Sequence, residues 1–196
     1  MKLSFERIGP GEIEKVEALV STEIARHPQV WIFGGGHVGR ALAGFLAALP
    51  VEAHLVESRE AEIALVADGT LTHLAAMPES LVPAMAPGSA VVVMTHDHAI
   101  DLAIADAALH QARIRGVGMI GSRTKAARMR SRLRSAGHGE EALARFRSPI
   151  GVSGITSKEP PAIALAVASE LMIRREAATT FHNKEDGRLA GGLRVV

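Results

Sequence analysis

The stretch WIFGGGHVGRA, Trp31 to Ala41, decides the expected fold. A short apolar run ends in three consecutive glycines and leads into a segment with helical spacing. The spacing Gly34-x-Gly36-x-x-Gly39 is the fingerprint of a dinucleotide-binding turn between a strand and a helix. The first glycine permits a tight turn, the second lets a ligand approach, and the third lets helix and strand pack closely. We therefore expect this turn to present a helix N-terminus to a phosphate-bearing ligand.

Strand-like and helix-like segments alternate along most of the chain. Strands are expected at residues 30–34, 51–57, 71–76, 89–95 and 117–121, and helices at about 40–49, 99–111, 124–135 and 160–176. The strands are nearly all apolar, which predicts a sheet that is covered on both faces. The sequence thus predicts an α/β protein: a Rossmann-like, doubly wound parallel sheet of order 3-2-1-4-5, with helices on both faces.

The predicted domain and its flanks differ in composition. Residues 1–28 are predicted to form an acidic amphipathic helix, the remnant of a preceding unit, because residues 6–23 carry five glutamates against two basic residues. Residues 29–177 form the Rossmann-like domain, and residues 178–196 are expected to be a C-terminal tail.

The composition excludes several classes of site. The 196 residues include no cysteine, which removes disulfides, zinc–thiolate sites, iron–sulfur clusters and a cysteine nucleophile. No secretory signal begins the chain, and no apolar helix reaches the ~20 residues of a membrane span, so we expect a cytoplasmic protein with no membrane contact. With no tyrosine, one tryptophan and five phenylalanines, stacking platforms are scarce and no nucleic-acid partner is expected.

An acidic residue, Glu57, ends the predicted second strand. At this distance from the glycines it would usually accept a hydrogen bond from an adenosine ribose. Arg59 follows two residues later and is placed either to meet a phosphate or to pair with Glu57 or Glu60, and a solvated strand end is the plain structural alternative. The sequence leaves these interpretations open.

Polar clusters follow the predicted first, fourth and fifth strands, whose carboxyl ends meet at the switch point of a doubly wound sheet. The members are His37 after the first strand, His96, Asp97, His98 and Asp101 after the fourth, and Ser122, Arg123 and Lys125 after the fifth. The histidines and aspartates suit a metal site or an acid–base site, although Asp97 is equally suited to capping a helix. The third cluster offers a hydroxyl, a helix N-terminus and two cations to an anion.

A fourth cluster, Lys158 and Glu159, precedes the last predicted helix, with Pro160 and Pro161 in its first turn. A lysine at a helix N-terminus is unfavourable to the helix dipole, which suggests a role beyond structure. Pairing between Lys158 and Glu159 is the plain structural alternative.

Four motifs together resemble the C-terminal domain of the XdhC/CoxI family, the xanthine dehydrogenase accessory proteins. They are FGGGHVGRALA (33–43), THDHAIDLAI (95–104), GMIGSRTKAARM (118–129) and SPIGVSGITSKEPPAIALAVA (148–168), and the likeness covers about residues 30–173. The resemblance implies a chaperone that binds the molybdenum cofactor, as molybdopterin or its dinucleotide form. It also implies two partners: a cysteine desulfurase during sulfuration of the cofactor, and apo xanthine dehydrogenase or a related molybdenum hydroxylase as its recipient.

The resemblance also marks motif positions, without assigning each a contact: Gly34, Gly36, His37, Gly39, His96, Asp97, His98, Ser122, Arg123, Lys125, Lys158 and Glu159. We expect a short form of the family that performs no turnover of its own and that self-associates. One alternative is an NAD(P)-dependent oxidoreductase with His96 or Lys125 as proton donor, and another is a nucleotide-sensing regulatory domain.

Overall fold

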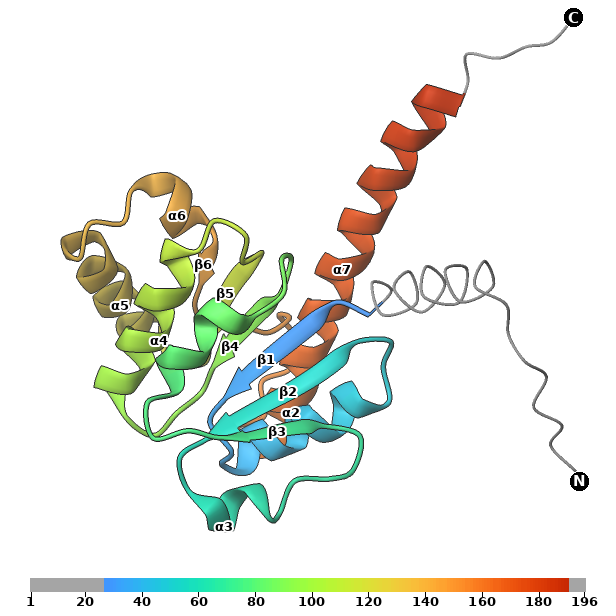
Figure 1. The fold of residues 1–196 in the computed structure, drawn as a ribbon. Coiled ribbons are helices and arrows are strands. Elements are labelled where there is room, and N and C mark those ends of the chain that lie inside the picture. Colours follow the sequence, from blue (N-terminus) through green and yellow to red (C-terminus); the bar gives the residue numbers. More distant parts are fainter. Residues whose placement is uncertain (1–26, 191–196) are drawn as a thin grey trace, which may run out of the picture.

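Six parallel strands form one sheet in the order β3-β2-β1-β4-β5-β6 in the computed structural model, which describes residues 27–190 (Figure 1). The strands are β1 (Gln29–Phe33), β2 (Glu52–Glu57), β3 (Leu71–Leu74), β4 (Ala90–Val93), β5 (Gly116–Met119) and β6 (Phe146–Arg147). The chain builds outward from β1 to β3 and then returns to place β4 beside β1, with Trp31 opposite Val91. This confirms the predicted Rossmann-like sheet and locates its switch point between β1 and β4.

The sixth strand was not predicted. It consists of two residues only, which pair with Val117 and Gly118 of β5. A two-residue strand has no periodicity that a sequence pattern could reveal.

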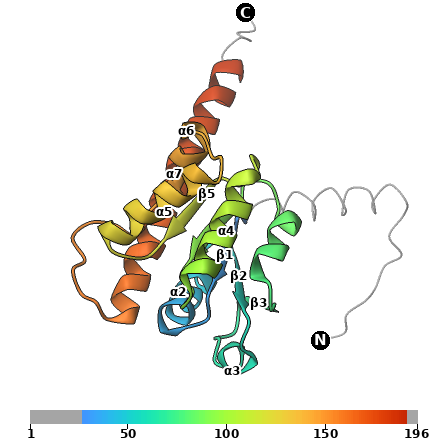
Figure 2. The same ribbon diagram turned by 90° about the vertical axis from the view of Figure 1, so that its left-hand side faces the viewer.

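Helices cover both faces of the sheet (Figures 1 and 2). They are α2 (His37–Ala47), α3 (Glu60–Ile63), the 3₁₀ helix η1 (Pro78–Ala84), α4 (His98–His110), α5 (Arg123–Ser135), α6 (Glu140–Ala144) and α7 (Pro160–Ala190). On one face, Leu42 and Leu46 of α2 pack with Val167 of α7 against β1, β2 and β4. On the other face, α4 and α5 contribute Ile104 and Leu133 to a second cluster of buried side chains. Burial of apolar area on both faces is the main stabilisation of such a sheet.

Helix α7 begins at Pro160, as predicted, but continues to Ala190 rather than ending near residue 176. The predicted tail at residues 178–196 therefore overlaps the end of this helix, which projects beyond the sheet (Figure 1). The predicted acidic helix before residue 27 lies outside the described residues. In residues 27–190, no helix combines the length and apolar character that crossing a membrane requires.

Candidate functional site

The glycine turn after β1 has one open position between two closed ones. Gly34 has a φ of 112°, and a Cβ there would lie 2.5 Å from the Met94 carbonyl oxygen. A Cβ at Gly39 would lie 1.9 Å from the Gly34 carbonyl oxygen, so α2 could not approach the turn with a larger residue. At Gly36 a Cβ would meet no atom within 4 Å. Two glycines thus serve packing, whereas the third leaves room above the N-terminus of α2.

Glu57 is almost entirely buried and holds the glycine turn in place. Its Oε2 accepts a hydrogen bond from the Gly35 N–H at 2.8 Å and another from Arg59 Nη2 at 2.8 Å. Its Oε1 accepts from the backbone N–H groups of Ser58, at 2.8 Å, and Arg59, at 3.1 Å. Arg59 therefore forms an ion pair with Glu57, and both oxygens of Glu57 have partners within the protein.

The environment of Glu57 strongly favours its charged form. Burial opposes ionisation, but the hydrogen bonds from the Arg59 side chain and from the backbone N–H groups of Gly35, Ser58 and Arg59 outweigh it. Together they lower the pKa of Glu57 from 4.5 to about 2. Glu57 is therefore an anion that fastens β2 to the turn after β1 at neutral pH.

A small crevice opens at the carboxyl ends of β1, β2 and β4, where the switch point was expected. The residues that line it come from the glycine turn, the end of β2, η1 and the start of α4: Gly34, Val56, Glu57, Ser58, Pro78, Thr95, His96 and Ile100. Of the predicted site residues, Gly34, Glu57 and His96 line it directly. Ser58, Pro78 and Ile100 were not predicted, because nothing in their types marks them as ligand contacts.

Two of the predicted polar residues cap helices. Asp97 accepts hydrogen bonds from the N–H groups of Ala99 and Ile100, at 2.6 and 3.2 Å, at the start of α4. These backbone bonds lower the pKa of the exposed Asp97 carboxyl. Ser122 accepts from the Lys125 N–H at 3.2 Å at the start of α5. Both helices begin at the carboxyl edge of the sheet. The N–H groups of their first turns that are not bonded to these capping side chains therefore lie at the same edge.

A buried ion pair joins the starts of α4 and α5. Asp101 is fully buried and accepts hydrogen bonds from Lys125 Nζ, at 2.9 Å, and from the Thr95 hydroxyl, at 2.7 Å. His98 Nδ1 lies 3.8 Å from the same carboxyl. Lys125 and Asp101, which were assigned to separate clusters, thus form one unit that fixes the loop after β4.

The switch-point histidines do not form a metal-ligand cluster with the neighbouring aspartates. His37, His96 and His98 are all exposed. Among the described side chains, the group whose metal-ligating atoms lie within 4.8 Å of one another is Asp106, His110 and His138, in the second half of α4 and the α5–α6 connection. Of the two uses left open for the switch-point histidines and aspartates, a metal site or an acid–base site, the described side chains bring together no metal-ligand set there.

Three predicted charged residues are exposed: Arg123 at the start of α5, and Lys158 and Glu159 just before α7. Within residues 27–177, the side chains of Lys158 and Glu159 form no ion pair with each other. The Ser157 hydroxyl accepts from the Glu159 N–H at 3.2 Å, which shapes the entry to α7. These charges are therefore accessible to a ligand or a partner.

Comparison with known proteins adds to this geometry. Residues 30–171 match the family described as the XdhC Rossmann domain. The chain belongs to this family. The matched residues contain all four motifs on which the XdhC resemblance rests, and the match confirms that resemblance. No curated protein matches the sequence significantly.

A solved structure with the same fold is a crystal structure of a xanthine dehydrogenase from Bacillus halodurans. The XdhC chain described here is 22% identical to it, with a TM-score of 0.64. The match covers 76% of this chain and 43% of that one, so this chain spans less than half the length of the solved protein.

Proposed function

We propose that this chain is an accessory protein that binds the molybdenum cofactor and assists its sulfuration and its insertion into xanthine dehydrogenase or a related hydroxylase. The observation that carries the proposal is the XdhC family match over residues 30–171, which indicates a general role in xanthine dehydrogenase maturation. The binding of the cofactor and the steps assisted are what the resemblance to the XdhC/CoxI family implies, and the arrangement of the site is compatible with binding.

The residues at the carboxyl edge suit a phosphate-bearing cofactor. Molybdopterin carries one phosphate, and its dinucleotide form carries a pyrophosphate and a nucleotide. The open position at Gly36 would let a phosphate reach the N-terminus of α2, whose N–H groups have no side-chain cap. Arg123 and Lys158 are exposed cations at the starts of α5 and α7 that would add charge-assisted hydrogen bonds. His96 in the crevice would offer a hydrogen bond to the pterin.

The state of Glu57 argues against the NAD-dependent form of the oxidoreductase alternative. A ribose diol needs a carboxylate acceptor at the end of β2. Here both oxygens of Glu57 are engaged by Gly35, Ser58 and Arg59. A ribose hydroxyl would have to displace one of these hydrogen bonds, which would loosen the glycine turn itself. We therefore propose a binding protein without turnover of its own.

The proposed partners are a cysteine desulfurase, the apo hydroxylase and a second copy of the chain. Leu71 and Leu74 of the edge strand β3, and Leu65 in the segment before it, are each more than half exposed. An edge strand with exposed leucines is a surface that natural proteins usually cover. This supports self-association through the β3 edge.

The proposal is tested by deleting the gene and measuring xanthine dehydrogenase in the same cells. We expect the enzyme to accumulate with little activity, because its cofactor is absent or unsulfurated, and the wild-type gene to restore it. Full activity in the deletion strain, together with micromolar NAD(P) binding by the purified chain, would refute the proposal in favour of an oxidoreductase.

A further inference from the structure

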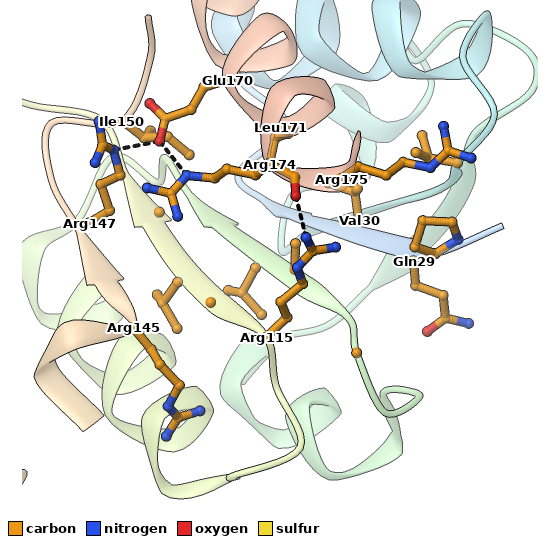
Figure 3. Close-up of a pocket in the computed structure, with 18 of the residues that line it drawn as sticks. Gln29, Val30, Arg115, Arg145, Arg147, Ile150, Glu170, Leu171, Arg174 and Arg175 are labelled. Carbon is orange, nitrogen blue, oxygen red and sulfur yellow. Dashed lines mark hydrogen bonds and ion pairs between the residues drawn. The ribbon is translucent and has the colours of Figure 1, made fainter. Parts of the chain in front are cut away.

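A second and larger cavity lies at the opposite, amino edge of the sheet. It has a volume of about 300 Å³ and opens between the sheet and α7 (Figure 3). Its lining residues include Pro28, Gly88 and Arg115, which lie one or two residues before β1, β4 and β5. No motif that marks the XdhC family predicted it, and none of the predicted site residues lines it.

The floor of this amino-edge pocket is apolar and made of small residues. Ala90, Gly116 and Gly118 of β4 and β5 contribute almost no side chain to it. A Cβ at Gly118 would lie 2.2 Å from Ile150 Cδ1, so glycine at this position lets the Ile150 side chain pack directly on β5 in its present conformation. Leu171 of α7 adds an apolar wall. A flat apolar floor of this kind suits a planar ring.

The rim, in contrast, is cationic. Arg115, Arg147 and Arg174 line the pocket, and Glu170, which lies beside Arg147 and Arg174, is the one carboxylate among its lining residues (Figure 3). Arg147 and Arg174 both donate to Glu170 Oε1, Arg174 at 2.9 Å, while Glu170 Oε2 accepts from the Gly151 N–H at 2.7 Å. The carboxylate is therefore shared between two guanidinium groups and cannot neutralise both.

Arg115 forms no ion pair with a carboxylate of the described residues. Its Nη2 donates instead to the carbonyl oxygen of Arg174 (Figure 3). Burial, and secondly the positive charge of Arg174, lower the pKa of Arg115. Two guanidinium groups held close together in a concave site repel each other, and an anion that binds between them offsets this repulsion.

We propose that the amino-edge pocket binds a small phosphate ester with a planar, largely apolar ring, its phosphate held by Arg115 and Arg174 and its ring resting on β4 and β5. Guanidinium groups match phosphate oxygens with paired hydrogen bonds, which makes arginine the suitable cation for this anion. The inference does not rest on the proposed function, because the pocket lies at the other edge of the sheet from the glycine turn.

The test is calorimetric titration of the full chain with AMP, and with adenosine as the analogue that lacks the phosphate. We expect AMP to bind, and adenosine to bind at least about tenfold more weakly, since it forgoes hydrogen bonds to charged groups. Arg115→Gln should weaken AMP binding by about tenfold or more. The control Arg128→Gln, which alters an exposed arginine of α5 outside the pocket, should leave it unchanged.

A third variant, Gly36→Asp, separates the two edges of the sheet. It places a carboxylate at the open position of the glycine turn and should not change AMP binding at the amino-edge pocket. Three results would overturn the inference: no AMP binding by the full chain, equal affinities in wild type and Arg115→Gln, or loss of AMP binding in Gly36→Asp but not in Arg115→Gln. Circular dichroism of each variant shows that the fold is retained.

Discussion

Replacing Glu57 with glutamine should destabilise the protein and remove part of its sensitivity to acid. The pKa of Glu57 falls from 4.5 to about 2 on folding. A shift of this size corresponds to about 3 kcal/mol of stability at neutral pH, all of which depends on the charged carboxylate. Glutamine keeps one acceptor for the Gly35 N–H but gives up the ion pair with Arg59. At pH 7 we expect the free energy of unfolding to fall by up to about 3 kcal/mol, or about 6–12 °C in Tm.

The sign of the pH dependence follows from the lowered pKa. The contribution of Glu57 is complete above its unfolded pKa of 4.5 and is lost as the pH falls toward the folded value of about 2. About 2 kcal/mol of it should therefore disappear between pH 7 and pH 3 in the wild type, but not in Glu57→Gln.

Urea denaturation at a series of pH values measures both effects. The exposed Glu141→Gln serves as a control that changes the same charge without a buried partner. Equal stability of wild type and Glu57→Gln at pH 7, or parallel curves from pH 7 to pH 3, would refute the role given to Glu57.

Two further substitution pairs test the packing of the site by urea denaturation. Gly39→Ala should destabilise the fold by several kcal/mol, since its Cβ would lie 1.9 Å from the Gly34 oxygen, whereas Gly44→Ala on the same helix meets no atom within 4 Å and should stabilise it by about 0.5–1 kcal/mol. Equal effects of the two would contradict the packing role. Asp101→Asn should cost about 3 kcal/mol because it leaves the Lys125 ammonium without its anion, and adding Lys125→Met should recover part of that loss. Additive losses in the double variant would show that the pair is not coupled.

The sequence predicted those parts of the fold that rest on local patterns. The glycine turn, the apolar strands and the Asp97 cap each have a physical cause within a few residues. The strand order also followed, because a strand–helix alternation permits few topologies. The length of α7 could not be predicted in the same way, since its polar second half from about residue 177 carries no apolar periodicity.

The candidate site was less predictable, because its contacts join residues far apart in the sequence. Asp101 and Lys125 lie 24 positions apart and meet only when α4 and α5 pack together. Arg115 and Arg174, which lie 59 positions apart, meet only when α7 crosses the amino edge of the sheet. The position of a residue relative to the predicted strands shows at which edge of the sheet it lies. The direction of its side chain depends on packing and could not be predicted in this way.

The central claim, that the glycine turn holds the phosphate of the molybdenum cofactor, is tested most directly by the pterin content of the purified chain. Wild type and Gly36→Asp would be purified from cells that make molybdopterin, oxidised, and assayed for pterin fluorescence. Aspartate at this position fits the open space and suits the start of a helix, so the variant should fold, while its charge repels a phosphate. We predict pterin in the wild type and little in Gly36→Asp. Wild-type protein without pterin would contradict cofactor binding, and equal pterin in both would contradict binding at this turn.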